Sequence, residues 1–236
     1  MTAISKEKMI GVIVCILLFC FISIANAQEK ITDETLMSID SEVKGYLEKG
    51  DINNAATKIL DAYEKAANDK SSLSPAATKD LSDNLFKMGE AVHKKDGADK
   101  ARNWLEKAIE MNNKNDEAHM LLGWTYFEKK DFDKSLSFFK AANAVNPSPK
   151  SYQLMAVTYF QEKAYQKALE ACDAGLKRNP AAEVASAMLN IRAMSNLMLG
   201  NHDQAKNDYL AAIKIDPQNK IAISNYNKLY PKKGSK

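Results

Sequence analysis

The chain has 236 residues, of which 45% are hydrophobic and 27% charged, which is ordinary for a folded soluble protein. Nine glycines and six prolines are too few for long low-complexity segments. The formal net charge of +3 is close to balance, so there is no electrostatic case for a nucleic-acid partner.

The first 27 residues predict a secretory signal peptide. Lys6 and Lys8 precede an apolar core from Met9 to Ile24, and Ala25-Asn26-Ala27 has the form of a cleavage site. The core of 16 residues would be about 24 Å long as a helix, shorter than the ~30 Å hydrocarbon layer of a membrane. We therefore expect cleavage after Ala27 and favour it over an uncleaved membrane anchor.

Such a signal would deliver the chain to the periplasm of a Gram-negative bacterium or to the outside of the cell. A lipoprotein is less favoured, because Val14 and Phe19, and not small residues, precede Cys15 and Cys20. Removing the segment leaves the chain near charge balance. The basic tail that begins at Lys232 is short, and we interpret it as a solvated end.

The first element expected after the signal is a helical hairpin over residues 32–70. Its two helices and its turn are marked by apolar, small and turn residues at helical spacing: Val43, Tyr46, Gly50, Asp51, Ala55, Ile59 and Ala62. Glu42 stands where the later units have an apolar residue. The segment is either a divergent first repeat or an N-terminal capping hairpin.

The units that follow are clearer. Ser74-Pro75 predicts the start of a helix that runs to about Lys95, and residues 82–115 form the next unit. In the unit over residues 116–148, apolar and small residues share one face of each helix: Leu122, Gly123 and Tyr126, then Ser135, Phe139 and Ala142. Such a hairpin cannot bury its apolar face alone, so it requires neighbouring units.

The same pattern recurs downstream at intervals of 33 to 37 residues, a period typical of helical repeats. It predicts units over residues 149–182 and 186–217. Residues 218–230 then predict a short amphipathic helix that covers the open face of the last unit.

Several of these residues carry a family resemblance. The set Leu122-Gly123-x-x-Tyr126, the pair Ser135 and Phe139, and Pro147 resemble the tetratricopeptide repeat (TPR). The resemblance extends over residues 82–217. It implies an all-α fold, a right-handed superhelical solenoid of antiparallel helix pairs with a C-terminal capping helix. The chain departs from the family pattern at Ser135, where Ala is usual, and at His119, where an aromatic residue is usual.

Small residues recur where the two helices of a unit should approach closely. They are Gly89, Gly123, Ala156 and Ala193, and a bulky side chain there would overpack the contact at a cost of roughly 1–3 kcal/mol. Three dipeptides are expected to end one helix and open the next, with Asn or Asp as the N-cap and Pro at the first helical position: Asn146-Pro147, Asn179-Pro180 and Asp216-Pro217.

The sequence offers little for catalysis. His93, His119 and His202 lie in separate repeats without partners at metal-ligand spacing, and there is no phosphate-binding loop or hydrolase motif. We expect no enzymatic activity, no cofactor and no metal. Cys172, the one cysteine outside the signal, occupies an inward helical position and is interpreted as a buried small hydrophobe, not a reactive thiol.

One charged pair is expected to be structural. Arg192 on a first helix and Asp208 on the second helix of the same unit should face each other. The surrounding residues resemble a TPR variant that has Asn-Arg-Gly and Asp-Phe at these places. We interpret the pair as an internal ion pair and not as a ligand site.

The resemblance places the binding surface on the first helices of the units, which line a concave groove in TPR arrays. The predicted peptide-binding residues form a stripe rich in aromatic residues and methionine, which suits an apolar peptide or helix: Phe86, Glu90, Met120, Trp124, Phe127, Gln153, Val157, Phe160, Asn190, Met194 and Leu197. Trp124 is the strongest single candidate. The alternative is that these side chains only pack between neighbouring repeats.

One known use of the family is disfavoured. TPR domains that grip the acidic tails of cytosolic chaperones use a Lys/Asn/Arg clamp. In this chain Phe86, Glu90, Leu121 and Leu154 occupy the corresponding places, and only Lys150 fits.

The leading hypothesis is a non-enzymatic scaffold of the bacterial envelope that holds a protein segment of an envelope or secretion complex in its groove. The second hypothesis is a structural module that associates with further copies of itself. A small-ligand or enzymatic role is the third and has the least support.

Overall fold

The computed structural model describes residues 31–68 and 73–231, and all regular structure within them is helical. The chain divides after Leu81 into two compact units. The boundary falls inside helix α4 (Pro75–Asp96), whose start agrees with the prediction from Ser74-Pro75. The predicted signal peptide lies outside the described residues, so it remains a prediction.

The first unit is built on the hairpin of α2 (Asp33–Glu48) and α3 (Ile52–Asn68). Val43 on α2 and Ile59 on α3 are fully buried. Gly50, in the turn, has a φ of 72°, a left-handed conformation that favours glycine. The described part of this segment is thus a pair of helices that pack against each other.

The beginnings of α2 and α4 are joined by a hydrogen bond. The backbone N–H of Ser74 donates to Asp33 Oδ1 over 3.1 Å. Hydrogen bonding from Ser74 lowers the pKa of Asp33, because it stabilises the charged carboxylate.

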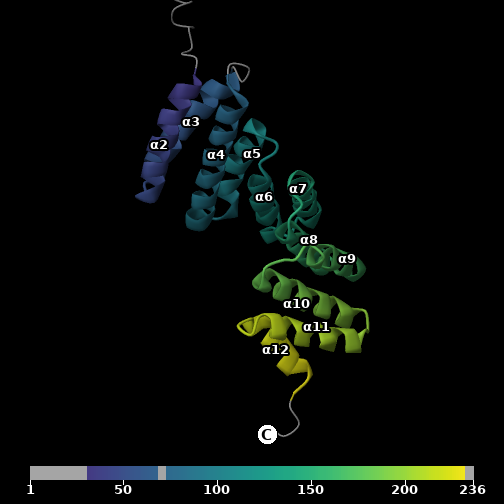
Figure 1. Cartoon of the computed structure of the whole chain (residues 1–236). Coiled ribbons are helices and arrows are strands. Elements are labelled where there is room, and N and C mark those ends of the chain that lie inside the picture. Colours follow the sequence, from purple (N-terminus) through teal and green to yellow (C-terminus); the bar gives the residue numbers. More distant parts are fainter. Residues whose placement is uncertain (1–30, 69–72, 232–236) are drawn as a thin grey trace, which may run out of the picture. The chain divides into compact units, whose positions relative to one another are not determined.

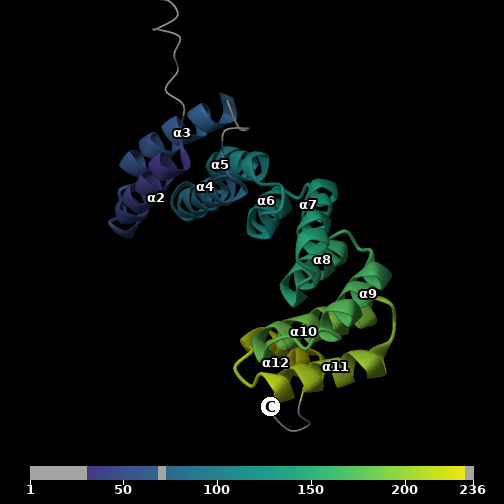
Figure 2. The same cartoon turned by 45° about the horizontal axis from the view of Figure 1, so that its top comes forward.

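The second unit contains the rest of α4 and a succession of helix pairs, shown in teal to yellow in Figure 1. The further helices are α5 (Ala98–Met111), α6 (Asp116–Glu128), α7 (Phe132–Val145), α8 (Pro149–Gln161), α9 (Tyr165–Leu176), α10 (Ala182–Met198), α11 (His202–Ile215) and α12 (Lys220–Leu229). From α5 to α12, each helix packs against the next along the chain. At the C-terminal end, α12 contacts α10 as well as α11. Figure 2 shows α10, α11 and α12 together at this end of the unit.

Two of the turns within the helix pairs use a non-glycine residue in the left-handed region. Lys130 between α6 and α7 and Lys163 between α8 and α9 both have a φ of 62°, and Gly200 between α10 and α11 has a φ of 81°. The same backbone conformation thus recurs at the turn of three successive pairs.

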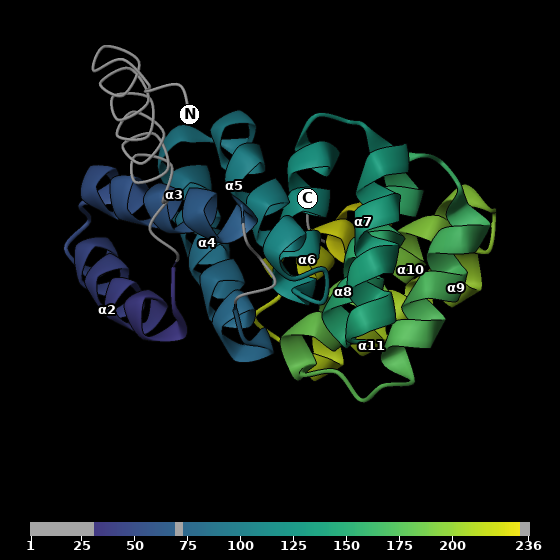
Figure 3. The same cartoon turned by 90° about the horizontal axis from the view of Figure 1, so that it is seen from above.

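Small residues permit the close helix contacts, as predicted. A Cβ atom placed on Gly123 of α6 would lie 2.7 Å from the ring of Phe139 on α7, and one on Gly89 would lie 2.8 Å from Leu105. Ala156 and Ala193 at the equivalent places are completely buried. Figure 3 shows α6, α7 and α8 as neighbours.

A serine and an asparagine join successive pairs in the same way at two places. Ser82 donates to the carbonyl oxygen of Ala108 over 2.7 Å and accepts from Asn115 Nδ2 over 2.9 Å. Asn115 Oδ1 also caps α6 by accepting from the N–H of Ala118. Ser186, Ala212, Asn219 and Ala222 make the same set of hydrogen bonds at the start of α12.

The three Asn/Asp-Pro dipeptides lie between helices, and two of them end a helix as predicted, but the prediction that they also open the next helix is wrong. Asn146 and Asp216 are the C-caps of α7 and α11, and Asn179 has a positive φ of 50° between α9 and α10. The next helices begin two or three residues after the prolines. Ser148 caps α8 with Pro149 as its first residue, and Asn219 caps α12.

The predicted pair of Arg192 and Asp208 is an internal ion pair. The Arg192 Nη2 and Nε atoms donate to the two carboxylate oxygens of Asp208 over 2.5 and 3.1 Å. Arg192 Nη1 donates to Asp173 over 2.7 Å, and Asn196 Nδ2 donates to Asp208 over 3.1 Å. Hydrogen bonding to Asp208 raises the pKa of Arg192, so the guanidinium stays charged in the folded chain.

We expect Gly123→Ala to destabilise the chain by about 1–3 kcal/mol, because the new methyl group would overlap the Phe139 ring. Chemical denaturation measures the free energy of unfolding. Gly45→Ala is the matched control, since a Cβ on Gly45 in α2 meets nothing within 4 Å and alanine favours a helix interior. Equal stability of Gly123→Ala and the wild type would contradict a required close contact.

We expect Arg192→Leu to cost about 3–5 kcal/mol, because it leaves the carboxylate of Asp208 without its cation in a buried place. Arg178→Leu, which removes an exposed arginine that lies over Tyr152, should cost at most about 1 kcal/mol. The double change Arg192→Leu and Asp208→Leu should cost less than Arg192→Leu alone. A double variant that is no more stable would show that lost packing, and not the unpaired charge, causes the effect.

Candidate functional site

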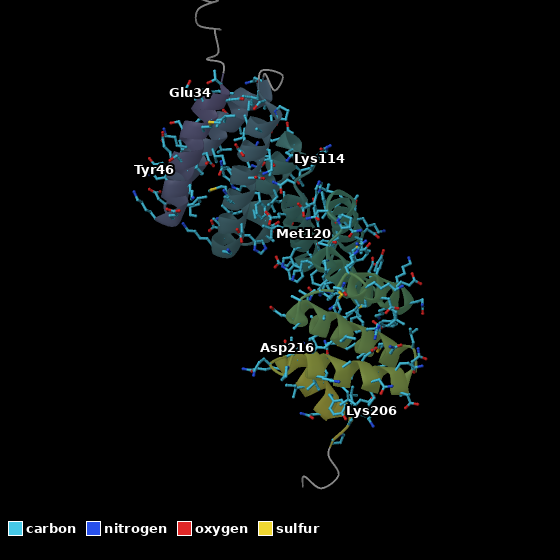
Figure 4. The ribbon with its side chains drawn as sticks, in the orientation of Figure 1. Glu34, Tyr46, Lys114, Met120, Lys206 and Asp216 are labelled. Atoms are coloured by element: carbon cyan, nitrogen blue, oxygen red, sulfur yellow. The ribbon has the colours of Figure 1, made fainter. Side chains whose placement is uncertain are left out.

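The first helices of three successive pairs enclose a hollow of about 350 Å³ within the second unit. Its lining comes from α4, α6 and α8: Phe86, Glu90, Glu117, Met120, Leu121, Trp124, Lys150 and Leu154. Met120, which projects from α6, is labelled in Figure 4. We refer to this lining as the hollow.

Helical spacing explains why these side chains meet. On α6, Met120 and Leu121 lie three and four residues after Glu117, and Trp124 lies three residues after Leu121, which places the four side chains on one face of the helix. Phe86 and Glu90 on α4 and Lys150 and Leu154 on α8 have the same four-residue interval. Leu122 and Gly123 are buried on the face of α6 that packs inside the unit, so the opposite side of the helix lines the hollow.

The apolar part of the hollow is half-buried and not closed. Phe86, Met120, Leu121, Trp124 and Leu154 all retain part of their surface in contact with solvent. Trp124 and Leu154 also pack against the buried core cluster that includes Leu136, Phe139 and Met155. The hollow is therefore continuous with the core and has a firm floor.

Trp124 is held in place by two neighbours. Its indole Nε1 donates to Glu128 Oε1 over 2.8 Å, and its ring stacks on Phe127 with 4.8 Å between ring centroids. The second oxygen of Glu128 lies 3.2 Å from His93 Nε2 on α4. The orientation of the indole is thus set before any ligand arrives, which lowers the entropic cost of binding.

Carboxylates outnumber ammonium groups in the lining. Glu90 pairs with Lys94 on its own helix over 2.9 Å, and Lys150 Nζ donates to Gln153 over 3.2 Å. Glu117 is exposed in the first turn of α6, where a negative charge is favoured by the helix dipole.

The structure brings together part of the predicted stripe. Phe86, Glu90, Met120 and Trp124 line the hollow, and Phe127 supports Trp124 beside it. Gln153 contacts Lys150 at its edge. In the described part of the chain, the predicted site residues on α4 and α6 thus form one cluster, and Gln153 of α8 lies at its edge.

The remaining predicted residues lie elsewhere. Val157 and Phe160 on α8 pack against the core cluster of Leu136 and Phe139. Asn190 on α10 is buried and accepts a hydrogen bond from Asn225 Nδ2 of α12 over 3.0 Å. The side chain of Asn225 also contacts the sulfur of Met194. Leu197 is half-buried farther along α10.

Four lining residues are absent from the predicted stripe: Glu117, Leu121, Lys150 and Leu154. Three of them occupy positions of the chaperone clamp. The four-residue intervals between Glu117 and Leu121 and between Lys150 and Leu154 could have identified them. Leu121 and Leu154 directly precede the buried residues Leu122 and Met155, so they lie on a neighbouring face of their helices.

The described residues contain neither a metal-binding cluster nor a reactive cysteine. No group of three or more His, Cys, Asp or Glu residues among them is placed to hold a metal ion. Cys172 is buried, and burial raises the pKa of its thiol to about 12, so it remains protonated and unreactive. His119 is buried with Nε2 3.0 Å from the carbonyl oxygen of Asn113. None of the helices in the described ranges has the length and apolar character needed to cross a membrane.

Two protein-family models match parts of the chain. A family model described as tetratricopeptide repeat matches residues 187–219, which contain most of α10 and all of α11. These residues therefore form a TPR unit. A second model, described as anaphase-promoting complex, cyclosome, subunit 3, matches residues 94–175. No curated protein matches the chain in sequence.

Solved TPR structures share the fold. A MamA crystal structure is 17% identical with a TM-score of 0.62, and the match covers 74% of this chain and 94% of MamA. MamA from Desulfovibrio magneticus RS-1 is 16% identical with a TM-score of 0.61, covering 78% and 97% of the two chains. A TPR protein from Parabacteroides merdae ATCC 43184 is 18% identical with a TM-score of 0.65, covering 84% and 73%. The predicted all-α TPR solenoid is confirmed.

Proposed function

We propose that this protein is a non-enzymatic scaffold that holds a segment of another protein in the hollow. The observation that carries the proposal is the preorganised Trp124, which presents an aromatic surface beside Phe86, Met120 and Leu154. Rigid aromatic side chains in a partly apolar depression are typical of the residues that dominate binding energy at protein interfaces. Repeat arrays of this kind also use the surfaces of successive units for binding.

The size of the hollow favours part of a peptide over a small-molecule substrate. Its volume of about 350 Å³ is near the lower end of ligand pockets, roughly 300–1,000 Å³, and its lining is open to solvent. It has room for one or two large side chains of a longer segment that continues along α4, α6 and α8. An enzymatic role has no support from the arrangement of the described side chains.

The second candidate is a module that associates with further copies of itself. Ile221 on α12 is 67% exposed and Leu229 is 45% exposed, so this helix leaves apolar surface uncovered. Exposed apolar residues of this kind can mark an interaction surface. We favour the hollow because its residues form a depression with a fixed aromatic side chain.

We expect Trp124→Ala to abolish capture of the partner in a crosslinking pull-down from the native cell envelope, because it removes the largest apolar surface of the hollow. Trp104→Ala on α5 is the matched control, since Trp104 does not line the hollow. Thermal unfolding of both variants shows that each is folded.

Retention of every partner by the Trp124→Ala protein would exclude the hollow as the binding site. Growth of the particle size with protein concentration in light scattering, without capture of another protein, would instead favour the self-associating module.

The proposed location is the periplasm or the cell exterior, after removal of residues 1–27. We expect N-terminal sequencing of the mature protein to begin at Gln28, because Ala25 and Ala27 provide the small residues of the cleavage site. Replacing both alanines with lysine should leave Met1 in place. A wild-type protein that begins at Met1 would contradict cleavage and favour an anchored form.

A further inference from the structure

We propose that the segment bound in the hollow carries a large apolar side chain next to lysine or arginine. This inference rests on the proposed function and specifies the chemistry of the partner. Three features support it: the apolar floor of the hollow, the hydrogen bond of the Trp124 indole and the charges at the rim.

The floor favours an apolar anchor. Phe86, Met120 and Leu154 come from three different helices and surround Trp124. The indole N–H of Trp124 is already bound to Glu128, so the ring offers its apolar surface and no free hydrogen-bond donor. A polar side chain inserted here would lose its contacts with water without gaining a partner.

The rim favours a cation beside that anchor. Glu90 on α4 and Glu117 on α6 both line the hollow, whereas Lys150 is the one lysine or arginine among the lining residues. Glu90 shares its charge with Lys94 on its own helix, so Glu117 is the main acceptor for a cation of the partner. Lys150 is directed to Gln153. Among the residues that the structure describes, the side chain of Glu117 has no hydrogen-bond or ion-pair partner.

The two glutamates are placed next to the apolar side chains. Glu90 lies one helical turn after Phe86, and Glu117 lies one turn before Met120 and Leu121, so each acid adjoins the apolar surface on its own helix. The long stem of a lysine or arginine can lie along such a surface while its charged end stays in water. A neighbouring acidic residue would instead be repelled by the carboxylate of Glu117.

Three labelled peptides of equal length test the inference by fluorescence anisotropy with the whole protein. The first has a Leu-Phe centre flanked by lysines, the second has the same centre flanked by glutamates, and the third keeps the lysines but has Ser-Ser at its centre. We expect the first peptide to bind about tenfold more tightly than either of the others at low salt. Its advantage over the glutamate peptide should shrink as salt screens the charges.

Two charge-neutralising variants locate the effect. Glu117→Gln and Glu90→Gln should each weaken binding of the lysine peptide about three- to fivefold, and neither should weaken the glutamate peptide. Glu106→Gln is the matched control, because Glu106 is exposed on α5 and does not line the hollow. All three changes are conservative, and thermal unfolding verifies that each variant is folded.

The outcomes separate this inference from the proposed function. If the glutamate peptide binds as tightly as the lysine peptide, or if both Gln variants bind like the wild type, the inferred chemistry is wrong. The hollow would still be the binding site if Trp124→Ala weakened both peptides.

Failure of all three peptides to bind would also overturn the inference. The proposed function would then depend on the envelope pull-down. It would fail as well if capture of every partner survived Trp124→Ala.

Discussion

The contact between Gly123 and Phe139 is the constraint on which the second unit depends. A side chain at position 123 would meet the ring at 2.7 Å, so α6 and α7 can pack this closely only because glycine has no Cβ. Gly89 against Leu105 repeats the principle within the pair of α4 and α5, and Gly175 against Met188 applies it between α9 and α10 of successive pairs. The two helices of a pair therefore lie close together. Neighbouring pairs can stack on them and bury the apolar surface that one pair alone leaves exposed.

The same contact determines which side chains remain available for binding. Because Leu122 and Gly123 face α7, Met120 and Trp124 lie on the side of α6 that adjoins α4 and α8. The hydrogen bonds of Ser82 and Asn115 connect the pair of α4 and α5 to the start of α6. They hold Phe86 and Glu90 beside the α6 residues. Binding and stability thus use opposite sides of the same helices, so a change such as Trp124→Ala can affect one more than the other.

Local patterns predicted the helix pairs well, because periodic apolar positions and small residues act within one unit. They predicted the inter-unit features less well. Asn146 ends α7 as predicted, but Ser148 and not Asn146 caps α8, since several residues are needed to turn the chain between units. Asn190 was placed in the predicted groove by its position in the repeat, and the structure shows it beneath α12, hydrogen-bonded to Asn225.

The sequence by itself determined that this chain forms helix pairs of the TPR type, that Arg192 faces Asp208, and that Cys172 is buried. These features depend on the spacing of residues along one helix or between two adjacent ones. Only the tertiary structure decided that Phe86, Trp124 and Leu154 meet in one hollow, with Glu90, Glu117 and Lys150 at its rim. These residues lie on three helices separated by the second helix of each pair, and their meeting depends on how successive pairs pack, which no local pattern specifies.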